Sequence, residues 1–414
     1  MRFPLVPLKF GATLNGATLP ETTNPDHEIR YCEISDISYG KTISWPEPIA
    51  FKEAPSRARR VVRPGDTLVS TVRTYLKAIS TADIAPCNAV ASTGFATLTP
   101  ANHLEPRFLK YAVLSDKFVF EVSRRSTGVS YPAITPQELV RIPIHRPAIE
   151  VQRTIADYLD HETAEIDALI ADLEHTSRLF FERLTARRDA AFASARAKHP
   201  LRRLKTVASL RGGNGFPHAE QGHVDRELPF FKVGSLAGAE NGVLRSSENT
   251  IDHETASRLG ATTFAPGTCV MAKIGAALLL ARTATLAVPS CIDNNMLGIT
   301  PVGDMDPTYL RFALGSISIA PFALPGAVPS LDVGAFRDAA IPVPSLTEQR
   351  AIVERLNHET VTSDDAVADL TRAITLAKER RAALITAAVT GQIDVTATHR
   401  PAAEQLADDI KELS

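Results

Sequence analysis

Basic and hydroxyl side chains gather in a few short stretches of this chain, and their chemistry suits binding of an anionic partner. Four arginines lie close together at Arg57, Arg59, Arg60 and Arg63, and a second cluster follows at 124–128 with the sequence Arg-Arg-Ser-Thr-Gly. Guanidinium groups make strong, charge-assisted hydrogen bonds to phosphates and carboxylates. Because the formal net charge is only −2, any nucleic-acid binding would have to come from such clusters or from partner proteins.

A search for catalytic apparatus finds no complete set of residues. The chain has no phosphate-binding G-x-x-x-x-G-K-[ST] loop, and the sequence His161-Glu162-Thr163 lacks the second histidine of a zinc-binding H-E-x-x-H helix. The glycine-rich stretch 211–216 does not fit a dinucleotide-binding loop, so we interpret it as an ordinary loop. The four cysteines lie far apart without C-x-x-C spacing, which favours buried thiols. We therefore expect neither an autonomous enzyme nor a metal centre.

The elements that must position these residues occur twice. Residues 152–173 and 349–370 align without gaps with eleven identities in twenty-two positions. Weaker matches relate the regions upstream, including Arg-Pro-Gly-Asp at 63–66 and Ala-Pro-Gly-Thr at 265–268. The order is globular region, helix, globular region, helix, and such repetition indicates a duplicated architecture.

The globular regions show the pattern of an α+β fold that is mainly β. Strands are predicted at 31–37 and 66–72 in the first copy and at 230–234 and 268–274 in the second, between turn-forming residues. Short helices should begin at Pro106 and Pro307, since proline suits the first helical turn.

The repeated segments are predicted to be long helices with an apolar seam. In the first, the seam runs through Ile155, Leu159, Ile166, Leu169, Leu173, Phe180 and Leu184. In the second, it runs through Ile352, Leu356, Val367, Leu370, Ile374, Ala377 and Leu384. Ser345 and Glu348 form a capping box, and Gly391 stands where the second helix should end. We expect the two helices to pack on each other as an antiparallel coiled coil; the alternative is that each packs only on its own globular region.

The chain resembles the specificity (S) subunit of type I restriction–modification systems. The residues that carry this resemblance are the duplicated proline-rich lead-in followed by Glu-x-Gln-Arg-x-Ile at 150–155 or Glu-Gln-Arg-x-Ile at 348–352. The closing run at 380–394, Arg-Arg-Ala-Ala-Leu-Ile-Thr-Ala-Ala-Val-Thr-Gly-Gln-Ile-Asp, looks like the closing signature of that family. The resemblance covers almost the whole chain.

The resemblance implies two target recognition domains, each reading half of a split double-stranded DNA sequence, at 1–147 and 200–344. Conserved helical spacers at 148–199 and 345–394 would set the distance between the halves, and 395–414 would form a polar tail. The spacers would bind two methyltransferase (modification) subunits, which recruit restriction/translocase subunits. S-adenosylmethionine, ATP and magnesium would belong to those partners, and this chain would bind no cofactor. Such a protein would work in the cytoplasm, because the chain has no apolar signal sequence or membrane span.

Candidate DNA contacts follow from the same implication, because arginine can pair with guanine and asparagine with adenine. In the first domain they are Arg57, Arg59, Arg60, Arg73, Lys77, Arg124, Arg125, Thr127 and Tyr131. In the second domain they are Arg211, Asn214, Lys232, Lys273, Arg282, Asn294 and Asn295. Candidate partner contacts are Gln152, Arg153, His161, Glu162, Gln349, Arg350, His358 and Glu359.

Two other classes of protein remain open. A protein-interaction scaffold would use the duplicated helices alone and show no sequence preference on DNA. An unusual nuclease would nick DNA with a metal ion. The near-neutral second domain, with equal numbers of basic and acidic residues at 200–345, predicts weak DNA binding by the free chain.

Overall fold

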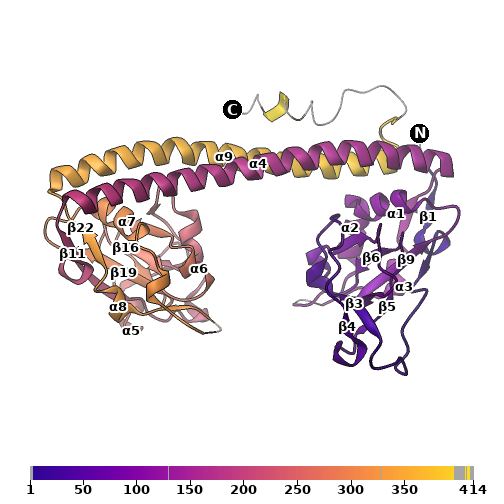
Figure 1. The fold of residues 1–414 in the computed structure, drawn as a ribbon, viewed down its shortest axis with the longest axis horizontal. Coiled ribbons are helices and arrows are strands. Elements are labelled where there is room, and N and C mark those ends of the chain that lie inside the picture. The colour runs from indigo at the N-terminus through magenta and orange to yellow at the C-terminus, as the bar shows by residue number, and fades with distance from the viewer. Residues whose placement is uncertain (1–2, 129, 327, 396–405, 407, 411–414) are drawn as a thin grey trace. The chain divides into compact units, whose positions relative to one another are not determined.

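The computed structural model describes residues 3–128, 130–326, 328–395, 406 and 408–410, apart from the side chains of 359–365. It divides into two compact units, the first formed by residues 1–175 and 370–414 and the second by residues 176–369. The long helices α4 (Ile149–Lys198) and α9 (Leu346–Thr390) contribute to both units. The predicted mixture of sheets with two long helices is confirmed (Figure 1). Among the described residues, no helix is long and apolar enough to cross a membrane.

Two four-stranded sheets form the body of the first unit. One is antiparallel, in the order β2-β9-β6-β7; the other has the order β4-β3-β8-β5, with β3 and β8 parallel. The strands are β2 (Ala12–Leu14), β3 (Glu28–Cys32), β4 (Ile49–Ala50), β5 (Ala58–Val61), β6 (Thr67–Ser70), β7 (Ile79–Thr81), β8 (Ala89–Ser92) and β9 (Phe95–Pro100). The helices of this part are α1 (Pro106–Leu114), α2 (Asp116–Arg125) and α3 (Pro136–Leu139). Within this unit α1 and α2 lie on the side of α4, while β3, β4 and β5 lie away from it (Figure 1).

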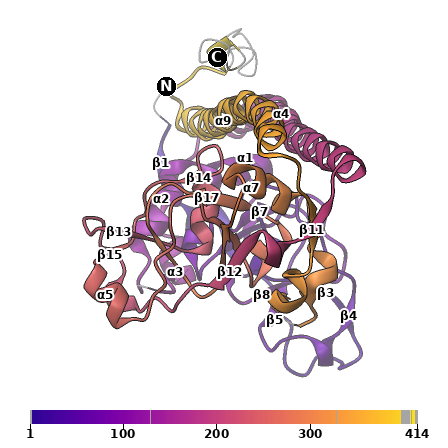
Figure 2. The same cartoon turned by 90° about the vertical axis from the view of Figure 1, so that its left-hand side faces the viewer.

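The second unit repeats this topology with one strand added to the larger sheet, β14, and one strand fewer in the smaller sheet, which has no counterpart of β5. Its larger sheet has the order β12-β19-β16-β17-β14, and its smaller sheet, β15-β13-β18, again contains a parallel pair, β13 and β18. The strands are β12 (Ala208–Gly212), β13 (Leu228–Phe231), β14 (Val243–Leu244), β15 (Thr250–Ile251), β16 (Cys269–Ala272), β17 (Thr283–Leu286), β18 (Cys291–Ile292), β19 (Met296–Pro301), β20 (Ala323–Leu324) and β21 (Ser330–Leu331). The helices are α5 (His253–Arg258), α6 (Ala276–Leu279), α7 (Pro307–Gly315) and α8 (Val333–Phe336). Figure 2 shows β13, β15 and α5 side by side at one side of this unit.

A short two-stranded ribbon closes each unit where the chain enters and leaves it. In the first unit β1 (Leu5–Pro7) pairs antiparallel with β10 (Pro143–His145), and in the second β11 (Leu201–Arg203) pairs with β22 (Ala340–Pro342). We call these two ribbons the necks. The repeated necks and sheets show that the duplication seen in the helices extends through the globular parts.

The two long helices run antiparallel within each unit. In the first unit, Ile155 and Leu159 share a buried cluster with Ile385 and Val389, and Ile166 shares another with Ala377. In the second unit, Phe192 and Leu356 belong to one core. The predicted packing of one helix on the other is thereby confirmed at Ile155, Leu159, Ile166 and Ala377. The sequence pattern did not include Phe192, Ile385 and Val389, which are also buried. Both predicted end signals are also confirmed: the Ser345 backbone N–H donates to Glu348 Oε2 at 3.0 Å, and Gly391 has a φ of 73°.

All four predicted strands end earlier than the sequence pattern indicates. β6 and β16 end two residues early, at Ser70 and Ala272, and the difference is larger for β3 and β13. β3 stops at Cys32 and β13 at Phe231, and each is followed by a 3-10 turn, Ile34–Asp36 or Val233–Gly238. The side chain at the third residue of each turn, Asp36 or Ser235, accepts a hydrogen bond from the backbone N–H that precedes the turn. This local capping competes with strand pairing, and periodicity alone cannot reveal it.

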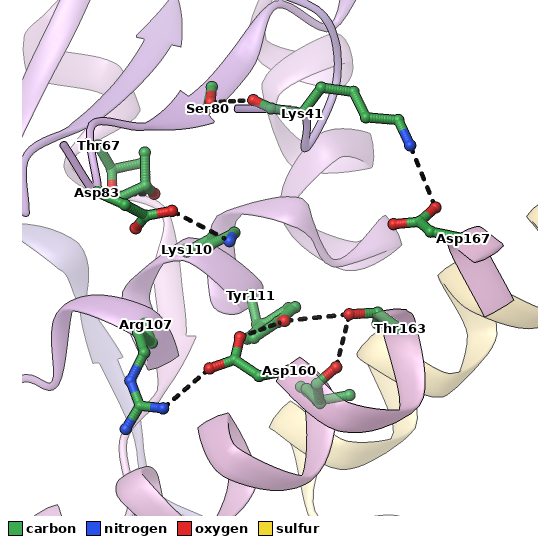
Figure 3. Close-up of polar contacts among 12 residues, drawn as sticks. Lys41, Thr67, Ser80, Asp83, Arg107, Lys110, Tyr111, Asp160, Thr163 and Asp167 are labelled. Atoms are coloured by element: carbon green, nitrogen blue, oxygen red, sulfur yellow. Dashed lines mark hydrogen bonds and ion pairs between the residues drawn. The ribbon is translucent and has the colours of Figure 1, made fainter. Parts of the chain in front are cut away.

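A polar network joins α1 to α4 in the first unit (Figure 3). The buried Tyr111 hydroxyl donates to Asp160 Oδ1 at 2.7 Å, and Arg107 Nη1 donates to Asp160 Oδ2 at 2.9 Å and to Asp157 Oδ1 at 2.7 Å. Burial raises the pKa of Tyr111, so the hydroxyl keeps its proton and remains a donor. Asp160 therefore accepts from both the buried Tyr111 hydroxyl and Arg107, whereas Asp157 accepts only from Arg107 in this network.

We expect Asp160→Ala to destabilise the first unit by about 1–2 kcal/mol, since it removes a charged acceptor from a buried hydroxyl. Asp157→Ala removes a surface ion pair and should cost less than about 1 kcal/mol. Thermal unfolding of the two variants beside the unmodified protein measures the difference. Equal losses for the two variants would contradict this account of the network.

Candidate nucleic-acid interface

Three backbone segments converge beside the parallel strand pair of the first unit. They are the residues after β3, beginning with Glu33, the residues after β6, from Thr71 to Arg73, and the turn between β8 and β9. The Thr71 backbone N–H donates to the Gly94 carbonyl at 2.8 Å, which fixes two of these segments to each other. They surround a hollow of about 510 Å³ lined by Glu33, Ile34, Ser35, Arg57, Val72, Arg73, Leu76, Ser92, Thr93 and Gly94.

An ion pair stands in the wall of this hollow. Arg57 Nη2 donates to Glu33 Oε2 at 2.6 Å, and Arg57 Nε donates to the Tyr31 hydroxyl oxygen at 3.0 Å. The hydrogen bond from Arg57 is the main reason why the pKa of Glu33 lies below its usual value. Both side chains therefore remain charged and oriented at neutral pH.

A strained turn carries Arg73 and Lys77 beside the hollow. Both residues adopt left-handed backbone angles, with φ of 51° and 49°, on either side of the 3-10 turn 74–76. Such angles are uncommon for side chains other than glycine and are concentrated at functional sites. The Arg73 guanidinium lies 5.4 Å from the ring centre of Tyr131, whose side chain is largely exposed. Arginine stacked on an exposed aromatic ring is well suited to contacts with nucleic acid.

The other candidates of the first unit differ in how they are engaged. Arg59 lies over the Phe51 ring, and Arg60 donates to Thr18, so these two side chains contact residues that do not line the hollow. Arg124 and Arg125 both donate to Glu121 at the end of α2. Thr127 begins the exposed loop that carries Tyr131, and its backbone pairs with Ala133. The structure thus brings Arg57, Arg73 and Tyr131 together and places Arg59 and Arg60 elsewhere.

The second unit has the same backbone arrangement with different side chains. Lys273 corresponds to Thr71, because the Lys273 N–H donates to the Asn295 carbonyl at 2.8 Å as that of Thr71 does to Gly94. Lys232 follows β13 as Glu33 follows β3, and Asp293 occupies the position of Ser92. Burial raises the pKa of Asp293, whose Oδ1 accepts a hydrogen bond from the Asn295 N–H.

Asparagine and arginine candidates of the second unit fall into two groups. Both amide atoms of Asn214 are engaged within the loop, with Nδ2 donating to the Gly260 carbonyl and Oδ1 accepting from the Thr262 N–H. Arg211, Arg282 and Asn294 are exposed, and Asn295 is partly buried. Asn214 therefore has an evident role in holding its own loop.

The partner candidates on the helices include two buried glutamines with matching contacts. Gln152 Oε1 accepts from the Glu105 N–H, and its Nε2 donates to the carbonyls of His103 and Pro147. Gln349 makes the same three bonds, to Asp306, Asp304 and Pro344. We call each set the glutamine clamp. It ties the start of a long helix to its own globular part, so neither glutamine side chain is presented on the surface.

The remaining partner candidates are divided between surface and interior. Arg153, His161, Arg350 and His358 are exposed, and Glu162 is buried. Glu359 belongs to the stretch whose side chains lie outside the described residues. Glu33 is not among the candidates identified from the sequence. The signal was available, because alignment of the two copies puts Glu33 at the position equivalent to the candidate Lys232.

Comparisons with known proteins identify the fold. No protein-family model matches the chain, and no curated protein sequence matches it. A solved structure described as "structural basis underlying complex assembly and conformational transition of the type I R-M system" contains a chain with a TM-score of 0.63 at 22% identity, covering 95% of this chain and 98% of that one. This chain therefore has the fold of a component of a type I restriction–modification system.

Two further structures are specificity subunits by description. The HsdS subunit from Thermoanaerobacter tengcongensis is 25% identical, with a TM-score of 0.43 and coverage of 94% of this chain and 97% of that one. The type I S subunit from M. genitalium is 12% identical, with a TM-score of 0.39 and coverage of 94% and 96%.

Proposed function

We propose that this chain is the sequence-specific DNA-recognition subunit of a type I restriction–modification complex. It would read a bipartite target and direct methyltransferase and restriction subunits to it, and it would itself be non-catalytic. The observation that carries the proposal is that both units repeat one backbone arrangement, which we call the frame, around the parallel strand pair. The side chains on this frame differ between the two units. One frame used twice with different polar groups suits two half-sites of different sequence.

The surface chemistry of the first unit supports contact with DNA. Arginines combined with an exposed aromatic ring offer phosphate contacts for position and base contacts for sequence. The proposal assigns S-adenosylmethionine, ATP and magnesium to the partner subunits and places the complex in the cytoplasm, where the DNA lies. The exposed residues Arg153, His161, Arg350 and His358 remain candidates for binding the two methyltransferase subunits.

The test is a map of methylated bases in cells that express this chain with its cognate methyltransferase subunit. We expect methylation at a split motif that disappears when the chain is removed. Exchanging residues 1–147 for those of a relative with a different target should change only one half of the motif. This exchange has one internal junction, after residue 147, which lies just beyond β10, so the two paired strands of the neck are exchanged together.

A folded, active complex that methylates without sequence preference would contradict the proposal and favour the scaffold. If the exchange changed the sequence of both halves of the methylated motif, the assignment of one half-site to each unit would be contradicted. The matched control is an exchange with a relative of identical specificity, which should leave the motif unchanged.

A further inference from the structure

The residue after β3 and its counterpart after β13 occupy the same backbone position with opposite charge. Glu33 has φ −113° and ψ 178°, and Lys232 has φ −108° and ψ 168°. Each precedes a 3-10 turn, and each backbone N–H is capped by the side chain three residues later. The frame is therefore the same in both units, and the difference lies in the side chain that it presents.

The carboxylate of Glu33 is held in a defined orientation without being enclosed. Oε2 accepts from Arg57 at 2.6 Å, and Oε1 accepts from the Ser35 hydroxyl at 3.1 Å. Its side chain is 39% exposed at the wall of the hollow, so outer lone pairs remain accessible. An ionised carboxylate can only accept hydrogen bonds, and each of its oxygens can accept about two.

Lys232 is oriented by a comparable set of neighbours. Its Nζ donates to Gln221 Oε1 at 2.5 Å and lies 5.4 Å from the ring centre of Phe216. Phe216 is itself fixed by stacking on Phe230, with ring centres 3.8 Å apart. The ammonium group has three donors, so two remain for a ligand.

We infer that Glu33 and Lys232 each select one base pair in the half-site read by their own unit. Glu33 would accept from the amino group of cytosine, and Lys232 would donate to the acceptors of guanine. The inference rests on the proposed function. The wall of the hollow contains Glu33 beside Arg57 and Arg73. If this wall faces DNA, the Glu33 carboxylate is repelled by phosphate, so its suitable partner is an amino group on the edge of a base.

The charge inversion explains how one frame can read two sequences. An acceptor-only group and a donor-only group at the same position favour opposite members of a G·C pair. The flanking positions differ as well: Arg73 corresponds to Gly275 and Ser92 to Asp293. The specificity of each unit would thus be set by side chains on a common frame.

The experiment uses the full complex of this chain with its methyltransferase subunit and a library of DNA duplexes. Each position of the motif mapped for the unmodified protein is randomised in turn, and methylation gives the base preference at each position. We expect Glu33→Gln to lower the preference at one cytosine-containing pair of the first half by roughly 10-fold to 100-fold, as is usual for a lost base contact. Lys232→Met should do the same at one guanine-containing pair of the second half. In each variant the other half stays unchanged.

Matched controls are Glu53→Gln and Lys205→Met, which alter exposed charges of the same type in the same units. Thermal unfolding should show all four variants folded, because both test positions are partly exposed. If Glu33→Gln and Lys232→Met leave every position preference unchanged, the inference is overturned while the proposed function stands. A uniform loss at all positions would indicate phosphate contacts and also overturn it. If the unmodified complex shows no split motif, the proposed function fails first.

Discussion

Gln349→Leu is expected to lower the free energy of unfolding of the second unit by about 3 kcal/mol. The substitution keeps the size of the side chain but removes all three bonds of the glutamine clamp. The Asp306 N–H and the Pro344 carbonyl would then lie in the interior without this partner, at about 1–3 kcal/mol for each buried group left unsatisfied. Hydrogen exchange of the amides in α7 and β22 reports the loss locally, which avoids assuming that both units unfold together.

Arg350→Leu is the matched control, since Arg350 is the next residue on the same helix and is exposed. It should change stability by less than about 0.5 kcal/mol. Gln349→Glu keeps the acceptor for the Asp306 N–H but puts a carboxylate oxygen against the carbonyls of Asp304 and Pro344. This contact favours the protonated carboxyl, which can donate to a carbonyl. The stability of the Gln349→Glu variant should therefore increase as the pH falls. Similar exchange rates in Gln349→Leu and Arg350→Leu would show that the clamp contributes little.

Gly213→Ala is expected to disrupt the second unit, whereas Gly215→Ala is not. A Cβ at position 213 would lie 2.1 Å from the Asp293 carbonyl oxygen and 2.3 Å from that of Ile292. Both contacts are with backbone, so relief requires displacing the end of β18. At position 215 no heavy atom lies within 4 Å of the added Cβ. We expect a loss of about 3 kcal/mol or more for the first substitution, at the upper end of overpacking costs.

Thermal unfolding of the two glycine variants provides the comparison, and base preference provides a second readout. Because the displaced segment carries Asp293 and Asn295, Gly213→Ala should weaken recognition of the second half-site while leaving the first unchanged. Near-identical unfolding temperatures for the two variants would contradict the predicted close contact.

Much of the fold could be predicted from the sequence because its signals are local. Pro106 and Pro307 begin helices as expected, and Gly65 and Gly267 adopt φ of 86° and 84° in the predicted turns. The ends of β3 and β13 could not be predicted from alternation, since side-chain capping by Asp36 and Ser235 decides them. The burial of Glu162 likewise depends on tertiary packing that no periodicity encodes.

The candidate site was harder to predict because neighbouring residues of one type have different surroundings. Arg57 lines the hollow, whereas Arg60, three residues later, donates to Thr18 instead. The glutamine clamp had a usable signal. Gln152 lies three residues before Ile155 and seven before Leu159, on the stripe that faces the interior. Gln349, Ile352 and Leu356 repeat this spacing.

The paired strands of the necks also bear on how such a chain can evolve. The chain enters and leaves each globular part through two paired strands, so the two ends of that part are adjacent. The segment between the two strands can therefore be replaced by recombination if the strands themselves are kept. The necks pair mainly through backbone groups, which any replacement can supply regardless of its side chains. Sequence changes between the two strands of a neck therefore need no matching change in the long helices. Under the proposed function, sequence changes can accumulate in the globular parts that would recognise DNA, while the long helices that would bind other subunits stay constant.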